Sequence, residues 1–262
     1  MDFLIAHNAL YIFSGLGVGV LVGLTGVGGG SLMTPLLVLF FGIHPSTAVG
    51  TDLLFAASTK TLGTLVHGVA RNIDWRLVGL LAVGSVTATI ASLYFLSTVN
   101  LDGATARRFT TVALGVVLLL TSAFLFFAER IPARYAERLA KCDQNTLRLL
   151  TIVLGATMGI LVTLTSVGAG AIGVTVLLFL HPKMPVSRLV GSDIAHAVPL
   201  TLLAGAGHWY LGSVDWSLLG PLLIGSLPGI LVGSLLVGRV PVGAVRTTLA
   251  LVLVIVAVKL MI

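Results

Sequence analysis

The stretch Leu24-Thr25-Gly26-Val27-Gly28-Gly29-Gly30 interrupts an apolar segment that runs from Tyr11 to Phe41. The apolar parts on its two sides are each too short to cross a bilayer, which takes about 20 helical residues. Glycine runs weaken helices because glycine loses more conformational entropy on folding and has no side chain to pack. The segment is therefore expected to form either one long broken crossing or a re-entrant hairpin of two half-helices.

The interruption recurs in the second half of the chain as Leu164-Thr165-Ser166-Val167-Gly168-Ala169-Gly170, at an offset of 140 residues. At an offset of 141, Gly50-Thr51-Asp52 matches Gly191-Ser192-Asp193, and His67 matches His208. This near-constant spacing indicates a duplication. We predict a first transmembrane repeat over residues 1–128, a linker over 129–148 that forms a surface helix, and a second repeat over 149–262.

The composition excludes a soluble protein. Hydrophobic residues make up 57% of the chain and charged residues only 9%, against roughly 25% charged residues in soluble globular chains. We predict an all-α fold, a polytopic transmembrane helical bundle of two inverted repeats, each with one glycine-interrupted segment and three spanning helices. The other apolar segments cover residues 48–70, 77–98, 109–127, 149–180, 189–211, 218–237 and 245–262.

The net charge of +6 is distributed as membrane orientation requires. Lys and Arg gather mainly in the gaps between apolar segments, and no basic and aromatic platform suggests a nucleic-acid partner. If both interrupted segments are hairpins, the two sides of the membrane carry eleven and three basic residues, so the termini lie outside and the linker is cytoplasmic. The eleven are Arg71, Arg76, Arg130, Arg134, Arg138, Lys141, Arg148, Lys183, Arg188, Arg239 and Arg246, and the three are Arg107, Arg108 and Lys259.

The two interruptions are the leading candidate for a substrate site. Glycine lets backbone N–H groups turn toward a ligand, and the N-terminus of a half-helix attracts an anion. Neighbouring hydroxyl groups add further donors. Close helix packing through small residues such as Gly15, Gly19 and Gly23 is the alternative interpretation. The predicted binding residues are Thr25, Gly26, Gly28, Gly29, Gly30, Ser31, Thr51, Lys60, Thr165, Ser166, Gly168, Gly170 and Ser192.

A polar stripe follows the second apolar segment. At about 100° per residue, Lys60 lies about 80° and His67 about 60° from Asp52 around a helix. A charge at mid-bilayer costs about 3 kcal/mol or more, so Lys60 is expected to neutralise a bound anion, to pair with Asp52, or to extend to an interface. The carboxyl groups of Asp52 and Asp193 are expected to brace the half-helices or to carry protons.

Histidines extend this stripe in both halves. His67 and His208 lie near segment ends, where they are expected either to pack at an interface or to relay protons. His196 is a further candidate, one turn beyond Asp193. The coupling candidates are therefore Asp52, His67, Asp193 and His208. Asp74-Trp75 and Asp215-Trp216 are interpreted as structural, with Asp capping the next helix and Trp anchoring a membrane boundary.

Sequence motifs of enzymes give no support for catalysis. Residues 168–173 match G-x-G-x-x-G, but they lie within an apolar segment and lack a βαβ context. No zinc-protease, nucleophile-elbow or P-loop motif occurs. With Cys142 as the only cysteine, a cluster of thiolates is excluded as a zinc site. We therefore predict neither catalytic residues nor a metal site nor a cofactor.

The chain resembles the sulfite exporter TauE/SafE family, also described as organosulfur anion permeases. The resemblance rests on the glycine stretch from Leu24 to Gly30, on Pro35, on the motif Ala48-Val49-Gly50-Thr51-Asp52 and on the spacing between them. The resemblance covers nearly the whole chain. It implies a carrier in the inner membrane of a bacterium or archaeon that moves sulfite, thiosulfate, sulfonates or related anions. The second half departs from the glycine pattern at Ser166 and Ala169.

The sequence thus predicts a secondary transporter for a small sulfur-containing anion, with the lipid bilayer as its surroundings and proton coupling as an option. An anion channel of the same fold is one alternative, and an intramembrane enzyme or assembly factor is another. The choice among anions, the direction of transport, the coupling ion and the oligomeric state are left open.

Overall fold

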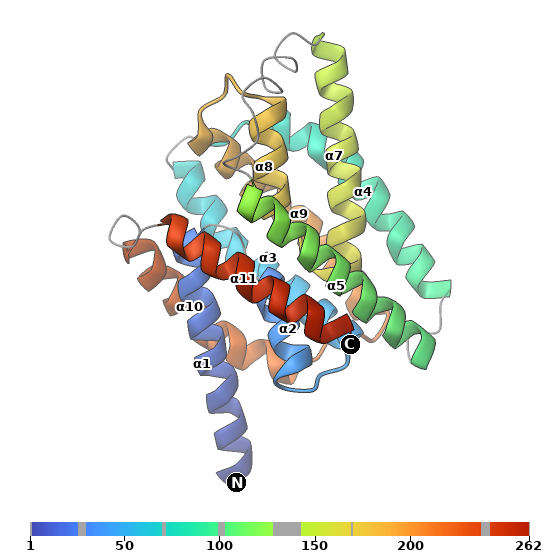
Figure 1. Ribbon diagram of the computed structural model, residues 1–262, viewed down its shortest axis with the longest axis vertical. Coiled ribbons are helices and arrows are strands. Elements are labelled where there is room, and N and C mark those ends of the chain that lie inside the picture. The colour runs from blue at the N-terminus through green and yellow to red at the C-terminus, as the bar shows by residue number, and fades with distance from the viewer. Residues whose placement is uncertain are drawn as a thin grey trace.

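The computed structural model describes residues 2–25, 30–69, 72–98, 103–127, 143–168, 170–236 and 242–261, and over these it is all-helical, as predicted (Figure 1). Five of the described helices are long and apolar enough to cross a membrane. The helices are α1 (Asp2–Thr25), α2 (Gly30–Leu39), α3 (Pro45–Val69), α4 (Trp75–Thr98), α5 (Ala104–Phe127), α7 (Gln144–Thr165), α8 (Ala171–Leu180), α9 (Val186–Tyr210), α10 (Trp216–Leu236) and α11 (Val242–Met261).

The first interrupted segment turns back on itself. Helices α1 and α10 run side by side in the same direction, because Gly15 lies against Leu222 and Gly19 against Ser226. Helices α3 and α9 are antiparallel, with Gly50 against His208, and α10 reverses direction after α9. It follows that α1 and α3 point the same way, so α2 must carry the chain back between them. This path is a hairpin and not a broken crossing.

The second interrupted segment has the same path. Helices α4 and α7 are parallel, since Gly155 lies against Leu81 and Gly159 against Ser85. Helix α9 is parallel to α4 as well, because Ser85 contacts His196 and Leu93 contacts Gly207. Helices α7 and α9 therefore point the same way, and α8 runs against both. In Figure 1 the short α8 returns toward the end of the molecule where α7 begins.

Contacts between the halves come in reciprocal pairs. Helix α1 packs against α10, and its counterpart α7 packs against α4, the counterpart of α10. The N–H of Asp74 donates to Ser192 Oγ at 2.8 Å, and the N–H of Asp215 donates to Thr51 Oγ1 at 3.0 Å. Each member of one bond is offset by 141 residues from its counterpart in the other. The contacts between the two halves are therefore reciprocal.

Glycines set the closeness of these helix pairs. A Cβ on Gly84 would overlap the carbonyl of Ile152, and one on Gly225 would overlap the carbonyl of Ile12. Gly15, Gly19 and Gly23 lie on the α1 surface that faces α10. The predicted packing through small residues is therefore found along α1.

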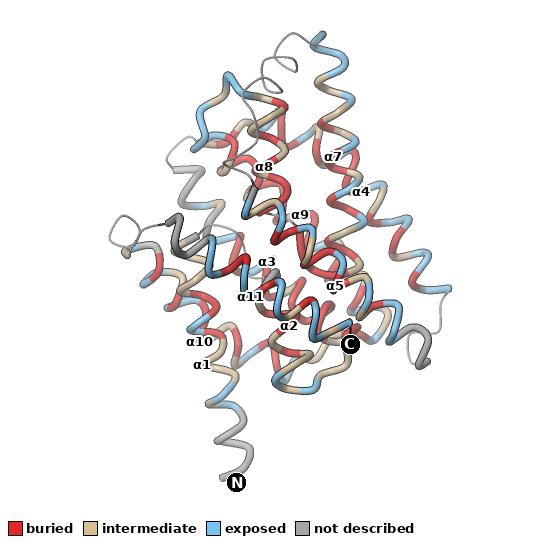
Figure 2. Tube along the Cα trace, in the orientation of Figure 1, coloured by how far each residue is buried: buried red, intermediate tan, exposed pale blue. Residues whose placement is uncertain are grey.

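Burial distinguishes a central pair of helices from an apolar outer shell (Figure 2). Helices α3 and α9 pack against each other and carry the buried charged side chains, while large apolar residues such as Leu235, Phe40 and Tyr94 are exposed. An exposed apolar shell is expected where lipid covers the protein. Helix α7 begins at Gln144, after the N-cap Asp143, so the last residues of the predicted linker are helical; residues 128–142 lie outside the described chain.

Candidate functional site

Asp52 on α3 braces α2 near the start of its second turn. Its Oδ2 accepts a hydrogen bond from the Thr34 N–H at 3.1 Å and another from Thr34 Oγ1 at 2.5 Å. Both residues are fully buried, with exposed fractions of 0%. The carboxyl group therefore fixes the half-helix that follows the glycine turn, which was one of the two roles expected for Asp52.

Lys60 lies two turns farther along α3 and is only 7% exposed. Its ammonium group interacts electrostatically with Asp193 and, less strongly, with Asp52. It also lies within electrostatic range of His196. The interpretation that Lys60 extends to an interface is therefore wrong. The side chain is retained inside because buried carboxyl groups from both halves compensate its charge.

Asp193 is the counterpart of Asp52 on α9 and is also fully buried. Its Oδ1 lies so close to Gly173, in the first turn of α8, that a Cβ there would overlap it. Among the described residues, neither carboxyl oxygen of Asp193 has a hydrogen-bond partner. Each central helix thus places a carboxyl group at the start of its own half-helix, but only Asp52 is held there by hydrogen bonds.

The turn between α7 and α8 is tightly ordered. Ser166 ends α7 in the left-handed conformation with φ 60°, and its N–H donates to the carbonyl of Val162 at 2.7 Å. Thr165 Oγ1 donates to the Leu161 carbonyl at 2.6 Å. Gly168 and Gly170 have φ of 119° and 116°, a region that favours glycine.

The Ser166 side chain reaches the centre of the molecule from this turn. Its hydroxyl is buried beside the Asp52 carboxyl group and has no hydrogen bond of ordinary geometry to any described residue. The turn of the second half therefore approaches the carboxyl group that braces the first half. A left-handed serine costs about 1 kcal/mol or more, and such residues gather at functional sites.

The predicted residues of the first turn can be placed only in part. Gly26, Gly28 and Gly29 lie outside the described residues, as do the side chains of Thr25 and Ser31. Gly30 begins α2. Their assignment to the substrate site stays a prediction.

Two predicted hydroxyl groups join the halves. Thr51 accepts the hydrogen bond from Asp215, and Ser192 accepts the one from Asp74 and donates to the Arg188 carbonyl at 2.7 Å. Both side chains are fully buried. Their described bonds connect α3 and α9 to the loops of the opposite half, and their role in binding a substrate stays a prediction.

The histidines of α9 are buried. His208 Nε2 donates to the Thr163 carbonyl at 2.9 Å, so this side chain packs inside the protein and the interfacial interpretation is wrong for it. His196 Nε2 lies 2.8 Å from Ser85 Oγ. Within the described structure, Nδ1 of both rings lacks a hydrogen-bond partner. The side chain of His67 lies outside the described residues.

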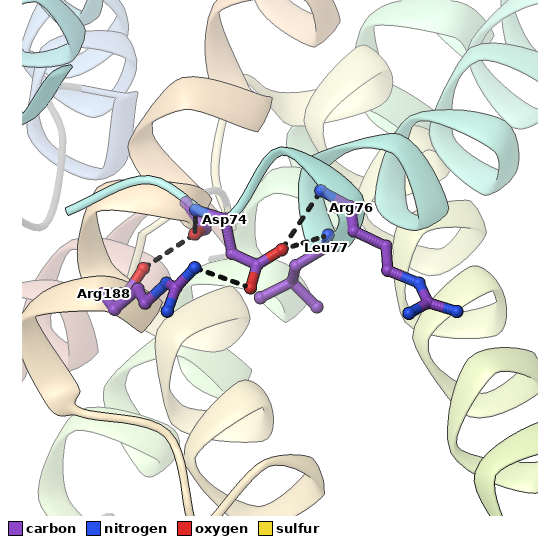
Figure 3. A network of polar contacts seen from close by, with 5 residues as sticks. Asp74, Arg76, Leu77 and Arg188 are labelled. Carbon is purple, nitrogen blue, oxygen red and sulfur yellow. Dashed lines mark hydrogen bonds and ion pairs between the residues drawn. The ribbon is translucent and has the colours of Figure 1, made fainter. Parts of the chain in front are cut away.

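The predicted helix caps are confirmed. Asp74 Oδ1 accepts hydrogen bonds from the N–H groups of Arg76 and Leu77, and its Oδ2 lies 3.3 Å from Arg188 Nη2 (Figure 3). Asp215 Oδ1 caps α10 in the same manner, through the N–H groups of Ser217 and Leu218. The carboxyl groups of both aspartates are thereby engaged at helix ends.

A cavity of about 360 Å³ lies beside Arg188 and does not include the buried charges of α3 and α9 in its lining. His181, Lys183 and Arg188 are the basic residues of that lining. Burial lowers the pKa of His181 from its ordinary 6.5, against an opposing effect of Asp74. His181 Nε2 lies 3.1 Å from Thr151 Oγ1.

Asp52, Asp193 and His196 thus all lie within electrostatic range of the buried Lys60, and Ser166 lies beside Asp52. Sequence reasoning missed Thr34, which is one hydroxyl within an apolar run and gives no periodic signal. The arrangement provides a buried cation between two carboxyl groups, which is suited to exchanging one negative charge for another.

Comparison with known proteins assigns the family. The profile of the sulfite exporter TauE/SafE family matches residues 11–260. The "Probable membrane transporter protein YjnA" of Bacillus subtilis is 38% identical over 216 residues, which cover 81% of this chain and 84% of that protein. A "Probable membrane transporter protein" of Methanocaldococcus jannaschii is 28% identical over 207 residues, covering 75% and 70%. No solved structure matches the chain. The chain therefore belongs to the sulfite exporter TauE/SafE family of membrane transporters.

Proposed function

We propose that the chain carries a small sulfur-containing anion, such as sulfite, thiosulfate or a sulfonate, across the inner membrane together with protons. The observation that carries this proposal is the buried ammonium group of Lys60, placed between carboxyl groups from both halves. A buried cation attracts an anion strongly because little water screens its charge. Sulfur as the central atom rests on the family description.

The charges of the site support coupling to protons. When Asp52, Lys60 and Asp193 are all ionised, they sum to one negative charge, and a bound anion adds at least one more. Uncompensated buried charge is costly, so the anion enters more easily when one carboxyl group takes up a proton. A carrier that binds proton and anion together meets this requirement.

The hairpins support alternating access from two sides. Helices α2 and α8 run in opposite directions because α3 and α9 are antiparallel. If both interrupted segments are hairpins, the basic residues gather on the side of the linker, and their excess supports a cytoplasmic location for that side. Both termini then lie outside. Inverted repeats with broken helices are common among secondary transporters.

The test is uptake into proteoliposomes with a panel of labelled sulfur anions, with and without a pH gradient. The wild type is expected to show saturable uptake of at least one anion, and Lys60→Ala to lose it. Lys259→Ala is the matched control, because Lys259 is exposed in the last turn of α11 and should transport normally. Normal transport by Lys60→Ala would contradict the role of the buried cation.

The same experiment separates the alternatives. Accumulation against the anion gradient, driven by pH, identifies a carrier, whereas flux that only dissipates the gradient and does not saturate identifies a channel. Failure of the wild type to move any anion of the panel would favour an intramembrane enzyme or an assembly factor.

A further inference from the structure

The two halves hold their buried carboxyl groups differently. Asp52 Oδ2 accepts two hydrogen bonds from Thr34, the shorter at 2.5 Å. The counterpart of Thr34 at an offset of 141 is Thr175, but its hydroxyl donates to the Ala171 carbonyl of its own helix at 2.7 Å. Asp193 thereby lacks the donor that the repeat would lead one to expect.

Nothing else in the described residues replaces that donor. Both carboxyl oxygens of Asp193 are buried without a hydrogen-bond partner among them. Gly173 of α8 lies directly against Oδ1 and leaves no room for a side chain. A buried carboxylate is stabilised by hydrogen-bond donors or by a cation, and here the cation is Lys60.

The helices packed against α9 bring few other charged groups to Asp193. Helix α8 carries no charged residue. The charged residue of α4 is Arg76, which is exposed, and that of α7 is Arg148, which is partly exposed; each lies near the start of its helix. Helix α3 supplies Lys60, Asp52 and His67, whose side chain lies outside the described residues. Helix α9 itself adds the buried His196 and His208 and the exposed Arg188, which pairs with Asp74. Asp52 has its own donor, whereas Asp193 depends on Lys60.

This dependence makes Asp193 and an anion competitors for the same cation. While Asp193 is ionised, it compensates the charge of Lys60. When Asp193 takes up a proton, that charge becomes available to an anion. One proton enters with one negative charge, so the binding of a monoanion leaves the total charge of the site unchanged.

We infer that Asp193, and not Asp52, is the residue that takes up and releases the transported proton, through its shared use of Lys60 with the anion. This inference rests on the proposed transport function and names the coupling residue within it. Asp52 is the positioning residue that holds α2.

The test compares Asp193→Asn with Asp52→Asn in proteoliposomes. The substrate is methanesulfonate, because it carries one negative charge throughout roughly pH 6 to 8, whereas sulfite changes charge in that range and thiosulfate carries two charges. Two quantities are measured for each variant: exchange of labelled for unlabelled anion at equal pH, and accumulation driven by an acidic exterior. Substrate affinity is recorded across the same pH range.

Asp193→Asn mimics the protonated residue. It should retain exchange within a few-fold of wild type, lose accumulation driven by pH, and bind the anion with an affinity that no longer varies with pH. Asp52→Asn is the comparison variant, because its amide oxygen can still accept both hydrogen bonds of Thr34 while one buried negative charge is removed. Its substrate affinity and exchange rate should change, but its accumulation should still be driven by pH and its affinity should still vary with pH.

The outcomes separate this inference from the function on which it rests. Accumulation that survives in Asp193→Asn, or that is lost only in Asp52→Asn, would overturn the inference. Wild-type transport without any response to pH would overturn the inference and leave anion transport standing. A wild type that moves no anion would overturn the proposed function itself.

A measurement on the wild type covers the case in which Asp193→Asn does not fold. Dicyclohexylcarbodiimide reacts with protonated carboxyl groups in apolar surroundings, and mass spectrometry locates the adduct. We expect the adduct on Asp193, at a rate that falls as pH rises. An adduct on Asp52 with none on Asp193 would overturn the inference.

Discussion

Thr34→Val removes the hydroxyl group that holds α2 to α3 and changes little else. The side chains have nearly the same shape, Thr34 and Asp52 are both fully buried, and the lost hydrogen bond is the 2.5 Å contact to Oδ2. A hydrogen bond to a charged group contributes about 1.5–3 kcal/mol. At about 1.4 kcal/mol per factor of ten, the population of the braced conformation falls roughly 12-fold to 140-fold relative to unfolded protein.

The loss in free energy of unfolding is measured on the purified protein in mixed micelles, which is unfolded by an increasing fraction of sodium dodecyl sulfate. Thr175→Val is the matched control, because its hydroxyl bonds only within α8 and its removal should cost less than about 1 kcal/mol. Equal losses in the two variants, or a loss below about 0.5 kcal/mol in Thr34→Val, would refute the brace.

Three further predictions concern packing, pH and orientation. Gly84→Ala should destabilise the protein by about 1–3 kcal/mol, because its Cβ would overlap a backbone carbonyl of α7. Gly79→Ala is the control, because a Cβ there meets open space, and it should be neutral or slightly stabilising. Equal melting temperatures of the two variants would contradict this prediction. Because burial lowers the pKa of His181, the unfolded chain binds the proton more readily, and stability should fall as pH drops below about 6.5. His181→Gln should lose that part of the pH dependence in thermal melts. Orientation is tested with single cysteines in a background without the native cysteine. Lys183→Cys, just before α9, should react with impermeant maleimide only from the cytoplasm, and Tyr210→Cys, at the end of α9, only from outside. The opposite labelling pattern would invert the proposed topology.

The fold class followed from composition and spacing, because low charge and apolar segments of membrane length leave few alternatives. The choice between a hairpin and a broken crossing did not follow from local sequence. It depends on which helices run in parallel, and the structure decides it through contacts such as Gly15 with Leu222, more than 200 residues apart. The excess of Lys and Arg on one side pointed to the same answer by a separate physical route.

The charged residues of the candidate site could be predicted from the sequence, whereas its uncharged residues could not. Asp52, Lys60 and Asp193 stood out because buried ionised side chains need a partner or a function. Thr34 did not, because a hydroxyl in an apolar helix can bond its own backbone, as Thr175 does. His208 was misjudged from its place near a segment end, since α9 packs against α7 there and buries the ring.

The reciprocal packing of α1 with α10 has a consequence for biosynthesis. Helix α1 leaves the ribosome well before α10, because the helix it packs against begins only at Trp216, some 190 residues after α1 ends. At about 5–20 residues per second, α1 waits roughly 10–40 s before its partner is synthesised. During that interval its glycine-lined face can pack only against lipid or an insertion factor. The second half has no such delay, because α4 is already in place when α7 emerges. Separately synthesised halves would each lack the partner of their first helix, so neither should reach its native packing until the two meet in the membrane.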